Sequence, residues 1–206
     1  MSSVKVSGSA TGTANFTIIA PSGTSTDRTL TLPDEAGTVL TSASDIAGQA
    51  GGITHFDAWR LSAGVSVSSG VTDITSANWE QVDSSDPALK GAGMSVSSGI
   101  FTFPVTGLWR IDFIGNYDSF SAAASYAGFR LYATLDGSSY GIAAEGWGNT
   151  YSATSNVAVP VTHYFDVTDT STHKIKFTCE LSTSCNLAGA TGQTRTGAFF
   201  TRLGDT

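Results

Sequence analysis

Residues 99–115 have the sequence GIFTFPVTGLWRIDFIG, in which aromatic and aliphatic residues alternate with polar ones around a proline and a glycine. After the glycine, Trp109, Ile111 and Phe113 fall on one face of an extended chain, and the charged residues between them fall on the other. Alternation with a period of two predicts a half-buried β-strand. The proline and glycine before it predict a turn.

The same period recurs in the rest of the chain from residue 55 onward. Segments with this pattern are FDAWRLS (56–62), VTDITSANWEQV (71–82), GFRLYATL (128–135), HKIKFTCEL (173–181) and GAFFTRL (197–203). In the further stripe at 157–165, Pro160 predicts an edge strand or a bulge, and we expect His163 to be a core or interface residue. Eight or more short strands with turn residues between them predict an all-β, antiparallel jelly-roll sandwich.

The composition supports this fold class and excludes some partners. The 28 Ser, 28 Thr and 23 Gly make up 79 of the 206 residues, and charged residues only 13%. Such a composition disfavours long helices and favours strands joined by tight turns. A net charge of −7 with only ten Lys and Arg argues against nucleic acid as a partner. No apolar run is long enough for membrane insertion, and no secretory signal is seen, so we expect synthesis in a cytoplasm.

Residues 1–42 differ from the rest, because they contain apolar residues only in short pairs and a single large aromatic residue. Short isolated strands are marginal in water, so this segment is expected to be an extended arm that is ordered by trimer partners or by a larger assembly. Residues 43–54 read as a linker and residues 55–206 as the head domain. The residues that we expect to serve in attachment and trimerisation are Phe16, Ile18, Leu30, Leu32 and Pro33.

The stretch from Gly99 to Phe113 resembles the signature of the complement 1q and tumour necrosis factor jelly-roll superfamily. In that family a Gly-x-Phe-x-x-Pro-x-x-Gly-aromatic motif leads into a central strand, and the closing strand GAFFTRL is also similar. The resemblance covers residues 55–205 and implies a trimer of jelly rolls without a cofactor. The loops at 115–127 and 145–156 depart from the animal proteins, so no ligand site is carried over.

A second stretch, DRTLTLPDEAGTVL at 27–40, is similar to the Thr-x-Leu-Pro-Asp-x-x-Gly-Thr-Leu element of phage tail and fibre proteins. That element usually lies in trimeric β stalks. The resemblance implies a virion protein that is assembled in the host cytoplasm and joined by its arm to other virion structural proteins. The alternative is an ordinary strand–turn–strand.

Acidic pairs are the strongest candidates for a metal site. Asp83 with Asp86, and Asp166 with Asp169, fit Asx-type turns or, alternatively, calcium ligands. The three histidines have no metal-binding spacing, so we expect no metal and no cofactor.

Catalytic motifs are not found either. The sequence contains no nucleophile elbow and no P-loop. Asp112, Asp118 and Glu145 would have to meet across a cleft to form a glycosidase pair, which the sequence does not establish. We therefore expect no catalytic residue. Cys179 and Cys185, six residues apart, are expected to be reduced thiols, with a hairpin disulfide as the alternative.

Exposed aromatic residues on loops are the candidates for recognition. The segment 121–128 contains Tyr126, and the segment 140–156 contains Trp147 and Tyr151 among Gly, Asn and Ser. Aromatic rings beside short polar side chains suit the surfaces of sugars or proteins. Alternatively, Trp147 and Tyr151 pack in the trimer interface.

Together these features predict a homotrimeric phage fibre protein, a tail fibre or related spike, whose head binds a host-surface glycan or protein. The nearest alternative is a capsid fibre or decoration protein with a structural role. A small glycan-cleaving enzyme and a secreted lectin-like module are further alternatives.

Overall fold

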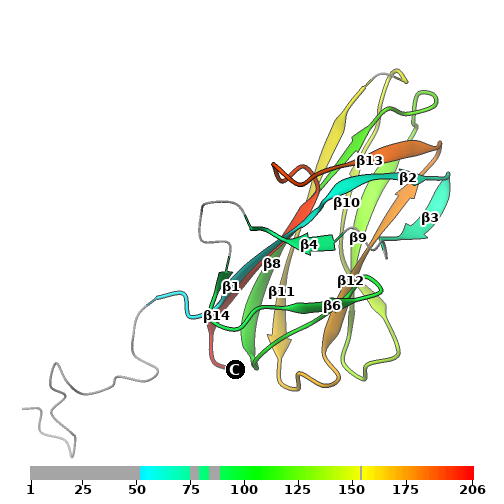
Figure 1. The fold of residues 1–206 in the computed structure, drawn as a ribbon. Helices are drawn as coiled ribbons and strands as arrows, with labels where there is room; N and C mark the ends of the chain where they lie inside the picture. The colour runs from blue at the N-terminus through cyan, green and yellow to red at the C-terminus, as the bar shows by residue number, and fades with distance from the viewer. Residues whose placement is uncertain (1–51, 75–78, 84–88, 154) are drawn as a thin grey trace, which may run out of the picture. The chain divides into compact units, whose positions relative to one another are not determined.

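The computed structural model describes residues 52–74, 79–83, 89–153 and 155–206. The predicted arm, with its five candidate attachment residues, lies outside these ranges. Within them the chain forms fourteen β-strands and no helix, so no membrane-spanning helix is found there (Figure 1). All strand pairs are antiparallel and form two sheets, which confirms the predicted all-β sandwich.

The larger sheet has eight strands. They are β1 (Phe56–Leu61), β2 (Ala63–Val67), β4 (Trp79–Gln81), β5 (Leu89–Lys90), β8 (Gly107–Asp118), β11 (Val157–Val167), β13 (Cys185–Ala190) and β14 (Gly197–Gly204). The order is β2-β13-β8-β14-β1-β4, with β11 on β8 and β5 on β1. Among the described strands β11 pairs only with β8, so Pro160 lies on an edge strand as predicted.

The smaller sheet has six strands. They are β3 (Gly70–Asp73), β6 (Ser95–Ser97), β7 (Ile100–Thr102), β9 (Ala127–Thr134), β10 (Gly141–Gly148) and β12 (Lys174–Leu181). The order is β10-β9-β12-β7-β6, and β3 pairs with β12. The alternation in β12 holds as predicted, with its apolar residues buried and its charged residues toward solvent.

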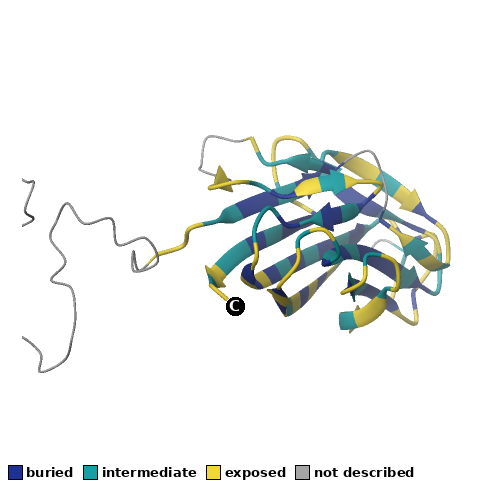
Figure 2. Ribbon diagram, turned by 90° about the horizontal axis from the view of Figure 1, so that it is seen from below, coloured by how far each residue is buried: buried dark blue, intermediate teal, exposed yellow. Residues whose placement is uncertain are grey.

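The core lies between the two sheets and is rich in aromatic residues (Figure 2). Phe113 of β8 stacks on Phe177 of β12 with ring centroids 4.5 Å apart, and Tyr117 of β8 stacks on Phe129 of β9 at 4.4 Å. Each pair joins one sheet to the other. Rings of this size remove a large apolar area from water, so these contacts fix how the sheets face each other.

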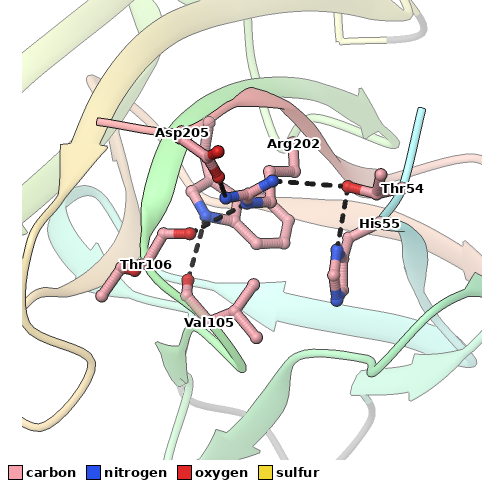
Figure 3. A network of polar contacts seen from close by, with 7 residues as sticks. Thr54, His55, Val105, Thr106, Arg202 and Asp205 are labelled. Carbon is pink, nitrogen blue, oxygen red and sulfur yellow. Dashed lines mark hydrogen bonds and ion pairs between the residues drawn. The ribbon is translucent and has the colours of Figure 1, made fainter. Parts of the chain in front are cut away.

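The Pro-x-x-Gly turn before β8 is held by a polar network beside the C-terminus (Figure 3). The Arg202 Nε donates to the Thr106 carbonyl at 2.8 Å, and its other nitrogens contact Asp205 and the Thr54 hydroxyl. Gly107 has a φ of +138°, and a Cβ there would lie 2.5 Å from the Arg202 Nε. The turn thus requires glycine both for its backbone conformation and for the approach of the arginine.

The head has two distinct ends (Figure 1). Thr54 and the C-terminus lie together at one end, which we call the proximal end. The loops that follow β8, β10 and β12 lie at the other end, which we call the distal end. Those loops hold one another by backbone hydrogen bonds, from Ser121 to Ser184, from Thr150 to Ala124 and from Ser182 to Tyr126.

Candidate functional site

Trp147 and Tyr126 lie together near the distal end, on the solvent-facing side of the six-stranded sheet. Their ring centroids are 6.0 Å apart and the rings are nearly perpendicular. The two side chains remain 43% and 41% exposed. The structure corrects the expected placement of Trp147, because it lies on strand β10 and not on a loop. Tyr126 lies in the loop just before β9, as predicted.

The indole of Trp147 lies flat over Gly128, its partner on strand β9. A Cβ on Gly128 would be 2.3 Å from the indole Cε3 and 2.7 Å from each of the two ring atoms bonded to it. A point in the ring plane beyond Cε3 would lie farther from both neighbours, so these distances place it above Cε3 and the ring presents its face to the glycine. Only a residue without a side chain leaves room for the ring in this position.

Arg130 of β9 joins the ring to two carboxylates. Its Nε donates to Glu145 at 3.0 Å, and its Nη1 lies 2.5 Å from a carboxylate oxygen of Glu180. The guanidinium is 5.0 Å from the centre of the Trp147 ring, within the range of a cation–π contact. The Arg130 hydrogen bond, and after it the Trp147 indole N–H, lower the pKa of Glu145. The carboxylate is therefore ionised and fixed beside the ring.

Tyr126, Gly128, Arg130, Glu145, Trp147 and Glu180 together form what we call the Trp147 patch. The sequence had suggested the two aromatic members as recognition residues. It had not suggested Gly128, Arg130 or Glu180. The signal that was available is the alternation in β9 and β12, which places Gly128, Arg130 and Glu180 on the outward face.

Tyr151, the third aromatic candidate, is 91% exposed in the loop after β10. In the part of the chain that the structure describes, no ring contact joins it to Tyr126 or Trp147. The structure thus brings two of the three candidates together. The neighbouring Thr150 is tied down, because its hydroxyl accepts from the Ala124 amide at 2.8 Å.

The outward face of the eight-stranded sheet carries apolar residues interspersed with polar and charged ones, and we call its apolar part the apolar face. Tyr164 and Leu203 on it are 56% and 50% exposed. Cross-strand neighbours connect the residues of β11, β8 and β14 into one surface. Its apolar members are Leu108, Ile114, Pro160, Tyr164, Phe199 and Leu203. The charges of Arg110 and Asp112 within it compensate each other, with Nε and Oδ2 2.7 Å apart.

A hollow of about 550 Å³ lies beside the distal part of the apolar face. Its polar wall includes Asp118, whose carboxylate accepts from the Asn186 side chain at 3.0 Å and lies 4.0 Å from Arg195. The other lining residues are Ile114, Asn116, Tyr117, Ser119, Asn156, Ala188 and Thr194.

The acidic residues considered for chemistry do not meet. Asp112 and Asp118 lie on β8, whereas Glu145 lies on the outward side of the other sheet. Asp169 accepts from the amide and hydroxyl of Ser171, which is the Asx turn expected for it. Among the described residues no cluster of three or more metal-ligating side chains is found.

Asp83 bonds to the buried Arg60 at 2.6 Å, and its predicted partner Asp86 lies outside the described residues. Asp83 therefore forms an ion pair with Arg60 in the described structure. Glu80 binds the same guanidinium at 2.7 Å. A buried arginine requires such partners.

The two cysteines are free and buried, as the sequence suggested. Cys179 lies on β12 and Cys185 on β13, so they belong to different sheets. Burial raises the pKa of each thiol to about 12. Both thiols are therefore protonated at neutral pH and poor nucleophiles. His163 is half-buried with its ring centroid 6.1 Å from that of Phe165, which fits the expected packing role.

No protein-family model matches the chain, and no curated protein matches it. Solved structures do match. Eiger TNF from S. frugiperda is 11% identical over 73% of this chain and 93% of its own, with a TM-score of 0.57. Murine APRIL at pH 5.0 is 12% identical over 72% of this chain and 98% of its own, with a TM-score of 0.54.

The PRD1 vertex protein P5 also matches, at 15% identity over 74% of this chain and 99% of its own, with a TM-score of 0.43. At such low identities the likeness to Eiger and APRIL shows the fold alone. The chain therefore has a TNF-like jelly roll, in agreement with the superfamily resemblance of residues 55–205.

Proposed function

We propose that this chain is a homotrimeric virion fibre protein of a bacteriophage, a tail fibre or related spike, which binds the host cell surface through its C-terminal head. The role is binding without catalysis, and the protein resides in the virion. The observation that carries the proposal is the apolar face of the eight-stranded sheet, which no described segment of the chain covers. Contiguous apolar surfaces are uncommon on soluble monomers and mark sites of association.

The apolar face is suited to contact between copies of the chain. The charges of Arg110 and Asp112 stay paired with each other when the face is buried, so burial leaves neither charge without a partner. Tyr164 and Leu203 project from it and supply apolar contact area. Three copies agree with the superfamily resemblance, and closed symmetry removes exposed sheet faces from water.

The two ends of the head support a role in attachment. The described chain begins at the proximal end, where Thr54 contacts Arg202, so an arm that precedes it joins the head there. The distal loops lie at the opposite end of the head from that junction, and the Trp147 patch lies near them on the outward face of the six-stranded sheet. Association through the apolar face leaves the patch accessible, because the patch lies on the opposite sheet. The phage-type element at 27–40 supports attachment of the arm to other virion proteins.

The first experiment is the mass of the purified chain in solution. We expect about three times 21.2 kDa. A monomer at micromolar concentration would contradict the proposal.

The second experiment addresses attachment. Purified chain is expected to compete with virions that carry it for adsorption to cells, and deletion of the head is expected to abolish adsorption. Normal adsorption without the head would contradict the receptor-binding part of the proposal.

An antibody against the head distinguishes the alternative, because signal on the capsid would indicate a capsid fibre or decoration protein. Incubation with host polysaccharide is expected to give no shorter products, whereas products would indicate a glycan-cleaving enzyme.

A further inference from the structure

We propose that the Trp147 patch is a saccharide-stacking site that takes the apolar face of a pyranose ring. The inference rests on the proposed attachment role and gives it a ligand class.

The indole has one covered face and one available face. Gly128 lies against the covered face, where a Cβ added to it would be only 2.3 Å from the ring. The residue is nevertheless 43% exposed, and since Gly128 covers one face, we assign this exposed surface to the opposite one. Arg130 is not the outermost layer, because its side chain is only 19% exposed. The face of an aromatic ring carries negative charge density, which attracts the weakly positive C–H groups on the apolar face of a pyranose.

The rim of the ring carries hydrogen-bonding groups in fixed positions. Glu145 is an acceptor beside the indole and is 44% exposed at its side chain. The Arg130 guanidinium has five N–H donors in a planar fork, of which the Nε is used by Glu145 and one on Nη1 by Glu180. Vicinal hydroxyl groups of a sugar need donors and acceptors next to the stacked ring, and this pair supplies both.

The support beneath the patch is rigid. The Gly128 carbonyl accepts from the buried Tyr117 hydroxyl at 2.6 Å, which ties the strand under the indole to the core. The Ser182 hydroxyl accepts from the Ser125 amide at 2.9 Å, which holds the loop that carries Tyr126. A preformed platform binds at a lower entropic cost than one that must be ordered by its ligand.

A sugar fits the patch better than a protein partner does. Hot spots of protein interfaces lie in desolvated apolar pockets, whereas the neighbours of Trp147 are Gly146, Gly148 and an ion-paired arginine. Contact between copies is better served by the apolar face. Nucleic acid is disfavoured by the net charge of −7.

Three variants of the full chain test the site. Trp147→Ala removes the ring, and Gly128→Ala keeps the ring but displaces it, because the new methyl group occupies its place. Displacement of a flexible side chain leaves the strand intact. Ile142→Ala is the matched control, since Ile142 lies on the same strand and the same outward face and is also exposed.

The variants are compared for binding to a panel of bacterial strains, untreated or treated with periodate, which oxidises vicinal diols, or with protease. We expect binding to be lost after periodate and kept after protease. Both patch variants are expected to bind roughly tenfold or more weakly, as for the loss of one stacking contact, and the control to bind like the natural chain. Binding that resists periodate but not protease would indicate a protein receptor and overturn the inference, while the attachment role would stand.

Periodate-sensitive binding that both patch variants retain would also overturn it, because the sugar would then bind elsewhere. If no strain is bound, the attachment role fails, and a direct titration decides the site. The chain has four tryptophans, so labelling with 5-fluorotryptophan gives four resonances, and the one lost in Trp147→Phe is that of Trp147. A selective shift of this resonance by methyl glycosides of glucose, galactose, mannose or N-acetylglucosamine supports the site, and no shift overturns it.

Discussion

Two glycines, one in each sheet, each hold an aromatic ring in place because they lack a side chain. Gly128 accommodates the exposed Trp147, and Gly115 on β8 accommodates Phe129 in the core. A Cβ on Gly115 would lie 2.2 to 2.5 Å from three atoms of the Phe129 ring. The same covalent change therefore has different consequences at the two positions, since a surface ring can move away and a core ring cannot.

Gly115→Ala is expected to lower the free energy of unfolding by about 1–3 kcal/mol, the usual cost of overpacking a core. The Phe129 ring cannot yield, because Phe113 and Tyr117 pack against it. Gly141→Ala is the control, since nothing lies within 4 Å of the added methyl group, and we expect a change within about 0.5 kcal/mol. Equal denaturant midpoints for the two variants would contradict this account.

Two histidines make the stability depend on pH. Burial, and after it the Arg202 charge, lower the pKa of His55 below 6.5, and burial lowers the pKa of His163. A histidine with a lowered pKa in the folded state prefers to be neutral there. Its contribution to folding stability is therefore present above pH 6.5, the pKa of the unfolded histidine, and is lost as the pH falls through the pKa of the folded state. We expect a lower melting temperature at about pH 5.5 than at about pH 7.5, and a smaller difference in the double variant His55→Gln/His163→Gln. An unchanged difference in that variant would exclude these histidines as the cause.

At the scale of elements, one buried carboxylate joins β1 to β4 within the eight-stranded sheet and to the residue just before β6 of the six-stranded sheet. Asp57 on β1 accepts from the Trp59 indole at 2.8 Å, from Gln81 on β4 at 2.7 Å and from the Met94 amide at 2.6 Å. The short strand β4 pairs only with β1 among the described strands. These hydrogen bonds thus supplement a pairing of few residues.

Asp57→Asn replaces one of the two acceptor oxygens by an amide donor, so at least one of the three donors then faces another donor. Because hydrogen bonds to a charged acceptor contribute about 1.5–3 kcal/mol, we expect a loss of about 2–4 kcal/mol in the free energy of unfolding and faster amide exchange in β4. Asp73→Asn is the matched control, since Asp73 forms an exposed ion pair with Lys176. Such pairs contribute at most about 1 kcal/mol. A loss at Asp57 no larger than at Asp73 would argue against its structural role.

Most strands of the head could be predicted from local alternation, because burial on one face leaves a period of two in the sequence. Strand β10 could not. Its sequence, GIAAEGWG, is made mainly of Gly and Ala, which favour strands little, and a register shift between Ile142 and Ala144 breaks its alternation. Pairing with β9 decides its structure, so Trp147 was expected on a loop.

The Trp147 patch was predictable only in part for a related reason. An exposed tryptophan can be suspected from its polar neighbours, but its contacts come from three strands. Gly128, Glu145 and Glu180 are adjacent only because β10, β9 and β12 pair in that order. The sequence does not contain this order in any local pattern, and the same holds for the apolar face, which joins β11, β8 and β14.

At the scale of the whole molecule, the two sheets have outward faces of opposite character. The eight-stranded sheet exposes apolar residues around the compensated Arg110–Asp112 pair on β8, β11 and β14, with further polar residues beside them, whereas the six-stranded sheet exposes aromatic rings beside charges. Lys176 illustrates the second kind, because its ammonium lies 5.6 Å from the Tyr132 ring and 5.3 Å from the Tyr140 ring. Such a surface is stable in water. From this contrast we expect the eight-stranded sheet to associate with other copies and the six-stranded sheet to remain accessible.

Tyr164→Glu tests this division of roles. Tyr164 is exposed in one copy of the chain, so a glutamate there is tolerated by the fold, but association would bury its charge. An unpaired buried charge is costly, so we expect the trimer of the variant to be weaker. When the protein is diluted, its mass should fall from three copies toward one at a concentration at least about tenfold higher than for the natural chain. Ile142→Glu places the same charge on the six-stranded sheet and is expected to leave that concentration unchanged. If both variants dissociate alike, or if only Ile142→Glu dissociates, then the apolar face is not the surface that holds the copies together, and the Trp147 patch would have to be considered as part of that contact.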